Sequence, residues 1–282
     1  MKKILLPTDF SDNAWNAIFT AVKMYASIEC QFYLLHAYEP NSLNLLGRKN
    51  TERLGVIYNS LAEYSTQELE KILDYLHKNH TNPNHSFESI SKPRTLEEAI
   101  QETASSKDID IVVMGTQGAT GAKEIFMGSN AVKVLKKIKN YPVLVVPSEY
   151  NFQNLKTLVL PTNYTQTYRK QQLSALTELV TIWNAKIQIL HVTAEFELND
   201  IQNDNREVLK NSFSTLDYSF YNAEFEEDIS HSIEKYLSKN TVDLMAMIRY
   251  EHTFWEKVIG EPVIKKITFH SKIPVLILPE YV

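Results

Sequence analysis

The stretch KKILLPTDFS, residues 2–11, decides the fold, because it returns later in altered form as LKTLVLPTNYT, residues 155–165. Two further segments repeat in the same order: FYLLHAYEP (32–40) as IQILHVTAE (187–195), and NYPVLVVP (140–147) as KIPVLILP (272–279). Self-similarity of this extent indicates two copies of one unit. Each copy spans about 140 residues, an ordinary domain size. We therefore expect one domain over residues 1–148 and a second over 155–282.

Short apolar strands alternate with amphipathic helices in each copy. The expected strands of the first copy are 3–7, 31–37, 85–91, 109–115 and 141–147. The expected helices begin after Ser11, cover 54–76, begin at 95, where Thr95 and Glu98 have capping-box spacing, and cover 129–139. One helical face of the first carries Ala14, Ala17, Ile18, Ala21, Val22 and Tyr25. The corresponding elements of the second copy are shorter, above all after LHVTAEFE (190–197).

This alternation predicts a parallel sheet with helices on both faces. The expected class is α/β, with two tandem doubly wound domains that each contain a five-stranded parallel sheet. In such sheets ligands bind beyond the carboxyl ends of the strands, where the winding reverses. Strands one and four are neighbours there, and they end in PTD (7–9) and MGTQG (114–118). The sequence therefore predicts a ligand crevice between these two ends.

Four of the seven glycines lie in MGTQGATGAKEIFMGSN, residues 114–130: Gly115, Gly118, Gly121 and Gly128. Glycine weakens regular structure by roughly 0.5–1 kcal/mol relative to Ala, so a cluster indicates an unusual turn or a close approach to the main chain. We expect Gly115 and Gly118 to let the chain leave strand four tightly and expose amide groups. Gly128 and Ser129 open a helix whose first N–H groups favour a phosphate. The window alone leaves open a plain turn at Gly118 with Ser129 as a helix N-cap.

Composition and charge exclude several classes of protein. The net charge of −5 and the lack of a basic block argue against nucleic acid as a partner. No apolar run approaches the ~18 residues of a membrane span, so no membrane contact is expected. The single cysteine, Cys30, excludes an internal disulfide and fits a cytoplasmic protein. We expect no catalytic residues and no metal ligands, because neither a nucleophile–base set nor metal-site spacing is visible.

A family resemblance rests on these same residues. Gly115-x2-Gly118-x9-Gly128-Ser129 resembles the nucleotide-binding signature G-x2-G-x9-G-[ST] of the universal stress protein (UspA-like) family. The segments ILLPTDFS, LLHAYEP and PVLVVP resemble other hallmarks of that family and occur in its order. The resemblance covers nearly the whole chain as a tandem pair. It implies a Rossmann-like fold of the adenine nucleotide alpha hydrolase type.

The resemblance also implies ATP, ADP or AMP as the ligand of the first domain, with magnesium as a candidate companion of the phosphates. The adenine end is then expected near Pro7, Thr8, Asp9 and Ala37. Met114 and Gly115 are expected to face the ribose and first phosphates. Gly118, Gly128, Ser129 and Asn130 are expected to hold the phosphate chain. For Asp9, an alternative role as the N-cap of the first helix stays open, and Ser11 offers the same cap.

The second copy departs from the signature. Gly260 aligns with Gly128, but Glu261 replaces Ser129, and its negative charge repels a phosphate at that helix start. The region of Gly115 and Gly118 becomes MIRYEHTFW (247–255), and Asp9 becomes Asn163. We expect the second domain to keep the fold without the nucleotide site. Arg249 and His252 leave open a different site or a solvated loop.

The fifth strands, PVLVVP and PVLILP, are short and apolar, and the resemblance implies that such strands pair between domains. We therefore expect pairing of the two domains within the chain as a pseudo-dimer, with a homodimer as a further possibility. The leading functional expectation is a nucleotide-binding regulatory stress protein with an unidentified protein partner and, at most, weak ATPase activity. The alternatives are a nucleotide-independent scaffold and an adenylyl- or phosphoryl-transfer enzyme.

Overall fold

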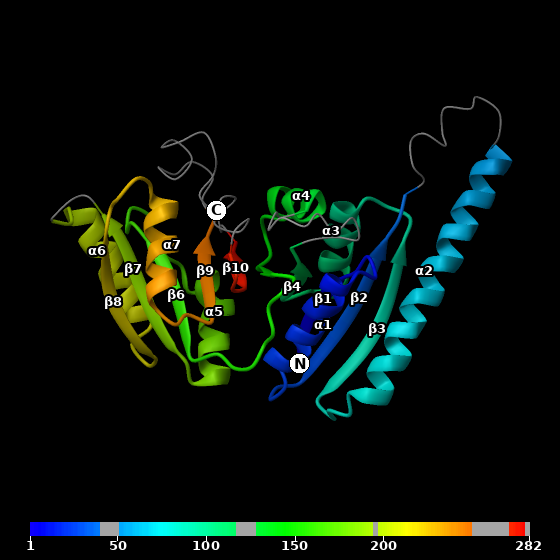
Figure 1. Ribbon diagram of the computed structural model, residues 1–282, viewed down its shortest axis with the longest axis horizontal. Coiled ribbons are helices and arrows are strands. Elements are labelled where there is room, and N and C mark those ends of the chain that lie inside the picture. The colour runs from blue at the N-terminus through cyan, green and yellow to red at the C-terminus, as the bar shows by residue number, and fades with distance from the viewer. Residues whose placement is uncertain (40–50, 117–127, 194–196, 250–270, 280–282) are drawn as a thin grey trace.

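The computed structural model describes residues 1–39, 51–116, 128–193, 197–249 and 271–279. Within these residues, the strands form one ten-stranded sheet in the order β3-β2-β1-β4-β5-β10-β9-β6-β7-β8 (Figure 1). The first half of the chain contributes β1 (Lys2–Pro7), α1 (Asp12–Met24), β2 (Cys30–Ala37), α2 (Thr51–Asn79), β3 (His85–Lys92), α3 (Leu96–Lys107), β4 (Ile111–Gly115), α4 (Ser129–Lys137) and β5 (Val143–Val146). The second half contributes β6 (Thr157–Thr162), α5 (Lys170–Trp183), β7 (Lys186–Thr193), α6 (Asp200–Ser212), β8 (Asp217–Glu224), α7 (Ile229–Lys239), β9 (Leu244–Ile248) and β10 (Val275–Leu278).

The strand order reverses at the first strand of each half. β1 lies between β2 and β4, with Ile4 opposite Phe32 on one side and Ile111 on the other, and both pairings are parallel. β6 has the same parallel neighbours in the second half, β7 and β9. The expected α/β class, with five parallel strands in each half and strands one and four adjacent, is confirmed.

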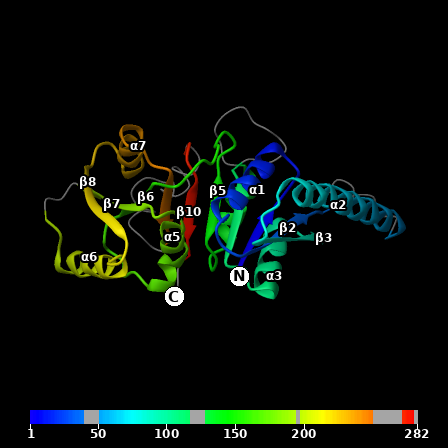
Figure 2. The same cartoon turned by 90° about the horizontal axis from the view of Figure 1, so that it is seen from below.

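Helices cover both faces of the sheet (Figure 2), so the inner strands are buried on both sides, whereas the edge strands β3 and β8 are only partly buried. One apolar core contains the inward faces of α1, α2, α5 and α6, and the other contains those of α3, α4 and α7. Five of the six residues of the predicted apolar face of α1 lie in the first core, and the sixth, Ala14, is buried and lines the cavity described below. Double coverage explains why the strands read as continuous apolar runs rather than as alternating patterns.

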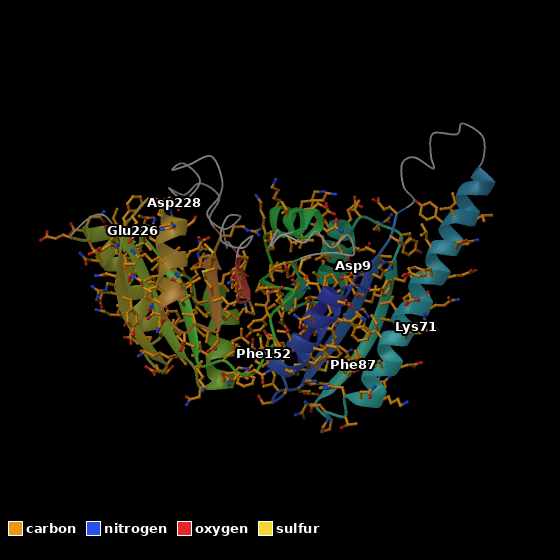
Figure 3. The ribbon with its side chains drawn as sticks, in the orientation of Figure 1. Asp9, Lys71, Phe87, Phe152, Glu226 and Asp228 are labelled. Carbon is orange, nitrogen blue, oxygen red and sulfur yellow. The ribbon has the colours of Figure 1, made fainter. Side chains whose placement is uncertain are left out.

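The two halves meet along β5 and β10, which pair antiparallel with Leu144 opposite Leu276. The indole Nε1 of Trp183 donates a hydrogen bond to the carbonyl oxygen of Met24, 2.9 Å away. Lys2 and Glu178 form an ion pair between β1 and α5. Phe152 lies between the halves, with its ring centroid 5.2 Å from that of Trp183 (Figure 3). Sheet continuity, aromatic packing and polar contacts thus join the halves.

The lengths of three helices can be compared with the expectation. α4 ends at Lys137 rather than at 139, because Ile138 takes an extended conformation. α2 has 29 residues and α6 has 13, so the expected shortening after the second strand of the second half is confirmed. In the part of the chain that the structure describes, no helix is both long and apolar enough to span a membrane.

Candidate functional site

A cavity of about 280 Å³ lies at the carboxyl ends of β1 and β4, where the strand order reverses. It is lined by Pro7, Thr8, Asp9, Ala14, Ala37, Leu96, Met114, Gly115, Thr116, Gly128, Ser129, Asn130 and Ala131. Nine of the ten sequence-predicted site residues are therefore brought together here. The tenth, Gly118, lies outside the described residues, as does Gly121. Parallel strands that end together place these side chains at one edge of the sheet.

Four lining residues were missed by the sequence reasoning: Ala14, Leu96, Thr116 and Ala131. Thr116 lies between two signature glycines and Ala131 follows Asn130, so their neighbourhood was a usable signal. Leu96 follows the capping residue Thr95, and Ala14 belongs to the apolar face of α1. Nothing in their residue types distinguishes these last two from core positions.

The turn between β1 and α1 forms one wall of the cavity. Phe10 adopts a left-handed conformation with φ 66°, and its amide donates to Thr8 Oγ1 at 3.0 Å. Ser11 is the N-cap of α1 and accepts from the amide of Ala14 at 3.2 Å. Asp9 Oδ1 accepts from Ser11 Oγ at 2.6 Å and from the Ser11 amide at 3.2 Å. The interpretation of Asp9 as the N-cap is therefore wrong, because Asp9 holds the capping residue instead.

Gly115 has a different structural role from the one expected. It is the last residue of β4, and the next amide, that of Thr116, donates to the carbonyl of Val146 at 3.0 Å. A Cβ added to Gly115 would lie 2.4 Å from Asn13 Oδ1 and 2.6 Å from Asn13 Cγ. Gly115 therefore lets α1 pack against β4. The amide that follows it is bonded within the sheet, so Gly115 does not expose an amide at the strand end as expected.

The start of α4 forms the opposite wall. Gly128 is the N-cap, no side chain among the described residues caps this helix, and its first turn contains no acidic residue. The alternative of Ser129 as the N-cap is therefore wrong: Gly128 donates to the carbonyl of Thr116 at 2.7 Å, which fixes the helix start one residue earlier. The first helical bond is from Val132 to Gly128, at 3.1 Å. The amides of Ser129, Asn130 and Ala131 precede it in a helix and have no intrahelical acceptor.

Four other described helices begin differently, whereas α5, like α4, has no side-chain cap. The starts of α1, α3, α6 and α7 are each capped by a side-chain oxygen, from Ser11, Thr95, Asn199 and Asp228 respectively. At α4 the backbone amides and the positive end of the helix dipole instead face the cavity. This arrangement favours an anionic ligand.

His36 lies on β2 directly before the cavity residue Ala37. Burial lowers the pKa of His36, and the nearby Asp9 carboxylate opposes this by raising it. His36 Nδ1 is 2.8 Å from Ser65 Oγ, and its ring packs 4.4 Å from that of Phe10. The imidazole thus links α2 to the β1–α1 turn beside the cavity.

The second half repeats the turn but surrounds it differently. Tyr164 has φ 57°, and its backbone amide donates to Thr162 Oγ1 at 3.0 Å, as the amide of Phe10 does to Thr8 Oγ1. Here α6 adds a clamp: Gln202 Nε2 donates to the carbonyl of Asn163 at 2.9 Å, and Asn205 Nδ2 donates to that of Tyr164 at 2.8 Å. Both amide side chains are buried.

Strand pairing also shows which residues replace the signature. Ile248 pairs with Leu278 at the end of β9, as Gly115 pairs with Val146 at the end of β4. The branched side chain of Ile248 thus replaces Gly115, which has no room for a Cβ in the first half. Arg249 replaces Thr116. Positions 260–262 and His252 lie outside the described residues.

Metal chemistry has no visible support in the described ranges. No group of three or more His, Cys, Asp or Glu side chains that could hold a metal ion occurs among residues 1–39, 51–116, 128–193, 197–249 and 271–279.

These features define the class: a doubly wound α/β protein with a cavity at the switch point of its sheet, where proteins of this class bind ligands. Residues 1–147 match the model of the universal stress protein family. The chain belongs to this family.

The known proteins that it resembles agree. Universal stress protein MJ0577 of Methanocaldococcus jannaschii is 32% identical over 157 residues, which are 51% of this chain and 94% of that protein. Universal stress protein MJ0531 of the same organism is 30% identical over 149 residues, 51% of this chain and 81% of that protein. The crystal structure of a universal stress protein from Archaeoglobus fulgidus superposes with a TM-score of 0.71, at 16% identity, over 98% of both chains. This superposition shows that the two chains share one fold over nearly their full length.

Proposed function

We propose that the first half binds an adenine nucleotide, with its phosphates at the start of α4. The observation that carries this proposal is the uncapped N-terminus of α4 in the cavity. Three amides without intrahelical acceptors, together with the helix dipole, suit a polyphosphate. Gly128, Ser129 and Asn130, with Gly118, are the proposed phosphate-binding residues, and Met114 and Gly115 face the ribose and first phosphates. Pro7, Thr8, Asp9 and Ala37 are the proposed adenine end.

The proposed ligand is ATP, ADP or AMP, and magnesium would accompany the phosphates rather than occupy a protein site of its own. The protein acts as a regulatory nucleotide-binding protein of the stress response, with at most weak ATPase activity, through a protein partner not yet identified. Asp9 Oδ1 accepts from Ser11, and His36 Nδ1 lies 2.8 Å from Ser65 Oγ, so each of these side chains already has a structural partner beside the cavity.

The proposed domains are residues 1–148, which carry the site, and 155–282, which do not. The pairing of β5 with β10 and the contacts of Trp183 support the pseudo-dimer as the working unit. The clamp of Gln202 and Asn205 over the turn of the second half, and Ile248 at the end of β9, support the loss of the site there.

The experiment is calorimetric titration of Ser129→Glu and Ser129→Ala with ATP and with adenosine. A carboxylate in the first turn stabilises a helix by about 0.3–1 kcal/mol, so S129E should fold as well as the wild type. It should repel the phosphates and lower ATP affinity at least about tenfold, a loss of about 1.4 kcal/mol. Adenosine affinity should change little, and S129A should lose only the hydroxyl contact. Absence of ATP binding by the wild type would overturn the proposal and favour the scaffold alternative.

A further inference from the structure

α4 has one end in the cavity and the other against the second half of the chain. Arg249 Nη1 donates a hydrogen bond to the carbonyl oxygen of Ile138 at 2.8 Å. Ile138 is the C-cap of α4, so this bond joins the second half to the C-terminal end of the helix whose N-terminal end lines the cavity.

Arg249 is held in place by its own backbone. Its amide donates to the carbonyl of Leu278 at 3.1 Å, at the end of the β9–β10 ladder. Thr116 makes the same backbone bond to Val146 in the first half. Arg249 is therefore the counterpart of Thr116, which lines the cavity in the first half. In the second half, the side chain at this position is directed to α4.

The chemistry of this contact suits a fixed anchor. The C-terminal carbonyls of a helix carry partial negative charge and accept well from a cation. A hydrogen bond from a guanidinium is charge-assisted and stronger than a neutral one. On the other side of the same turn, Lys137 pairs with Glu97 of α3 at 3.2 Å. The last turn of α4 is thus held from within the first half by Glu97 and from the second half by Arg249.

A short helix transmits position from end to end. α4 has nine residues and is about 13 Å long at 1.5 Å per residue, and a single hydrogen-bonded helix of this length moves as a rigid unit. A displacement of the C-cap therefore shifts the amides of Ser129, Asn130 and Ala131 in the cavity.

We propose that Arg249 is a positioning residue for the phosphate end of the nucleotide site, through which the second half sets the affinity of the first. This inference rests on the proposed function, because it acts on the phosphate-binding end of α4. Coupling of this kind is reciprocal, so a nucleotide bound at the first half strengthens the contact to Arg249.

The test uses the full-length chain with Arg249→Met, Arg249→Lys and a matched control, Arg169→Met. Arg169 is an exposed arginine of the second half at the start of α5, so its removal changes the net charge equally. ATP and adenosine are titrated separately by calorimetry. R249M should lower ATP affinity by about three- to tenfold, the effect of losing one hydrogen bond, and leave adenosine affinity within about twofold. R249K should recover part of the loss, because an ammonium still donates, and R169M should bind both ligands as the wild type does.

The outcomes separate the two proposals. If the wild type binds ATP and R249M binds it with unchanged affinity, the inference is overturned and the proposed function stands. If ATP and adenosine affinities fall together, Arg249 serves only the stability of the fold, and the positioning role is overturned. If R249M does not fold, the comparison of ATP with adenosine in R249K decides by the same criteria. If the wild type binds no ATP, the proposed function fails and the inference fails with it.

Discussion

Among single residues, Gly115 most directly joins the fold to the site. Its missing Cβ makes room for Asn13, which is buried and donates from Nδ2 to the carbonyl of Val146 at 3.3 Å. Gly115→Ala would place a methyl group against Oδ1 and Cγ of Asn13 and 3.0 Å from its backbone oxygen. We expect a loss of about 1–3 kcal/mol in the free energy of unfolding, as for other overpacked sites, measured by urea denaturation.

A double-mutant cycle gives the control. Asn13→Ala removes both side-chain atoms in closest contact, so the double variant should lose less stability than the sum of the two single variants. Additive losses would show that the side chain of Asn13 is not what requires glycine at this position.

Gly115 also shows what a sequence can and cannot reveal about a residue. The motif identified it as a site residue, and it does line the cavity. The physical reason for glycine is a contact with Asn13 on another element, and such a contact is set by packing that no local pattern encodes.

Among the elements, the junction of α2 with β3 predicts a dependence of stability on pH. His80 Nε2 lies 2.8 Å from His85 Nδ1, and His85 Nε2 lies 3.1 Å from the carbonyl of Tyr25. His85 Nε2 donates to this carbonyl, so in the neutral ring Nδ1 is the nitrogen that accepts, from His80 Nε2. Burial lowers the pKa of both imidazoles, and the neighbouring His80 lowers that of His85 further, while the bond to Tyr25 opposes the shift.

The sign follows from proton uptake. Because the pKa values of these histidines are lower in the folded state, the unfolded chain binds more protons in acid. Their contribution to the free energy of unfolding is therefore fully present above the unfolded pKa of about 6.5 and is lost as the pH falls below it toward the folded-state values. His80→Gln/His85→Gln should flatten the fall in the free energy of unfolding between about pH 7 and pH 5. His36, whose pKa is also lowered, retains part of the slope. The control is His77→Gln, which changes an exposed histidine of α2. Equal slopes in all three proteins would contradict the assignment.

Helix starts show the limit of local patterns at this scale. The capping box of α3 was predicted correctly, with Glu98 N bonded to Thr95 Oγ1 at 3.3 Å and Thr95 N to Glu98 Oε2 at 3.4 Å, because every partner lies within four residues. The start of α4 at Ser129 was also predicted correctly, but its capping residue was left open between Gly128 and Ser129, because the bond from Gly128 to Thr116 that fixes the cap joins residues on either side of the β4–α4 connection. Caps made within a helix are readable from sequence, and those made across a loop are not.

At the scale of the whole molecule, the internal repeat predicted the class and the strand order, because buried parallel strands leave a strong apolar pattern in each copy. The individual bonds between the halves left no such pattern. The indole of Trp183 reaches Met24, and Arg249 reaches Ile138, and neither residue type by itself indicates a partner in the other half. Only the arrangement of β5 and β10 side by side brings these residues together.

A sheet continuous through β5 and β10 predicts that the halves unfold together. A ligand of the folded state adds about 2.7 kcal/mol of stability at about a hundred times its Kd, and amides that exchange only by global unfolding then exchange about a hundredfold more slowly. If the ten strands unfold as one unit, saturating ATP should slow hydrogen exchange of the most protected amides equally in β2 and in β7. Of these two strands, β2 adjoins the proposed site and β7 does not. Hydrogen-exchange mass spectrometry of the full chain measures both. Slower exchange confined to β1–β5 would show instead that the halves open independently. A Lys2→Met/Trp183→Phe variant lacks the ion pair to Glu178 and the hydrogen bond to Met24. This variant should shift the protein toward independent opening of the halves.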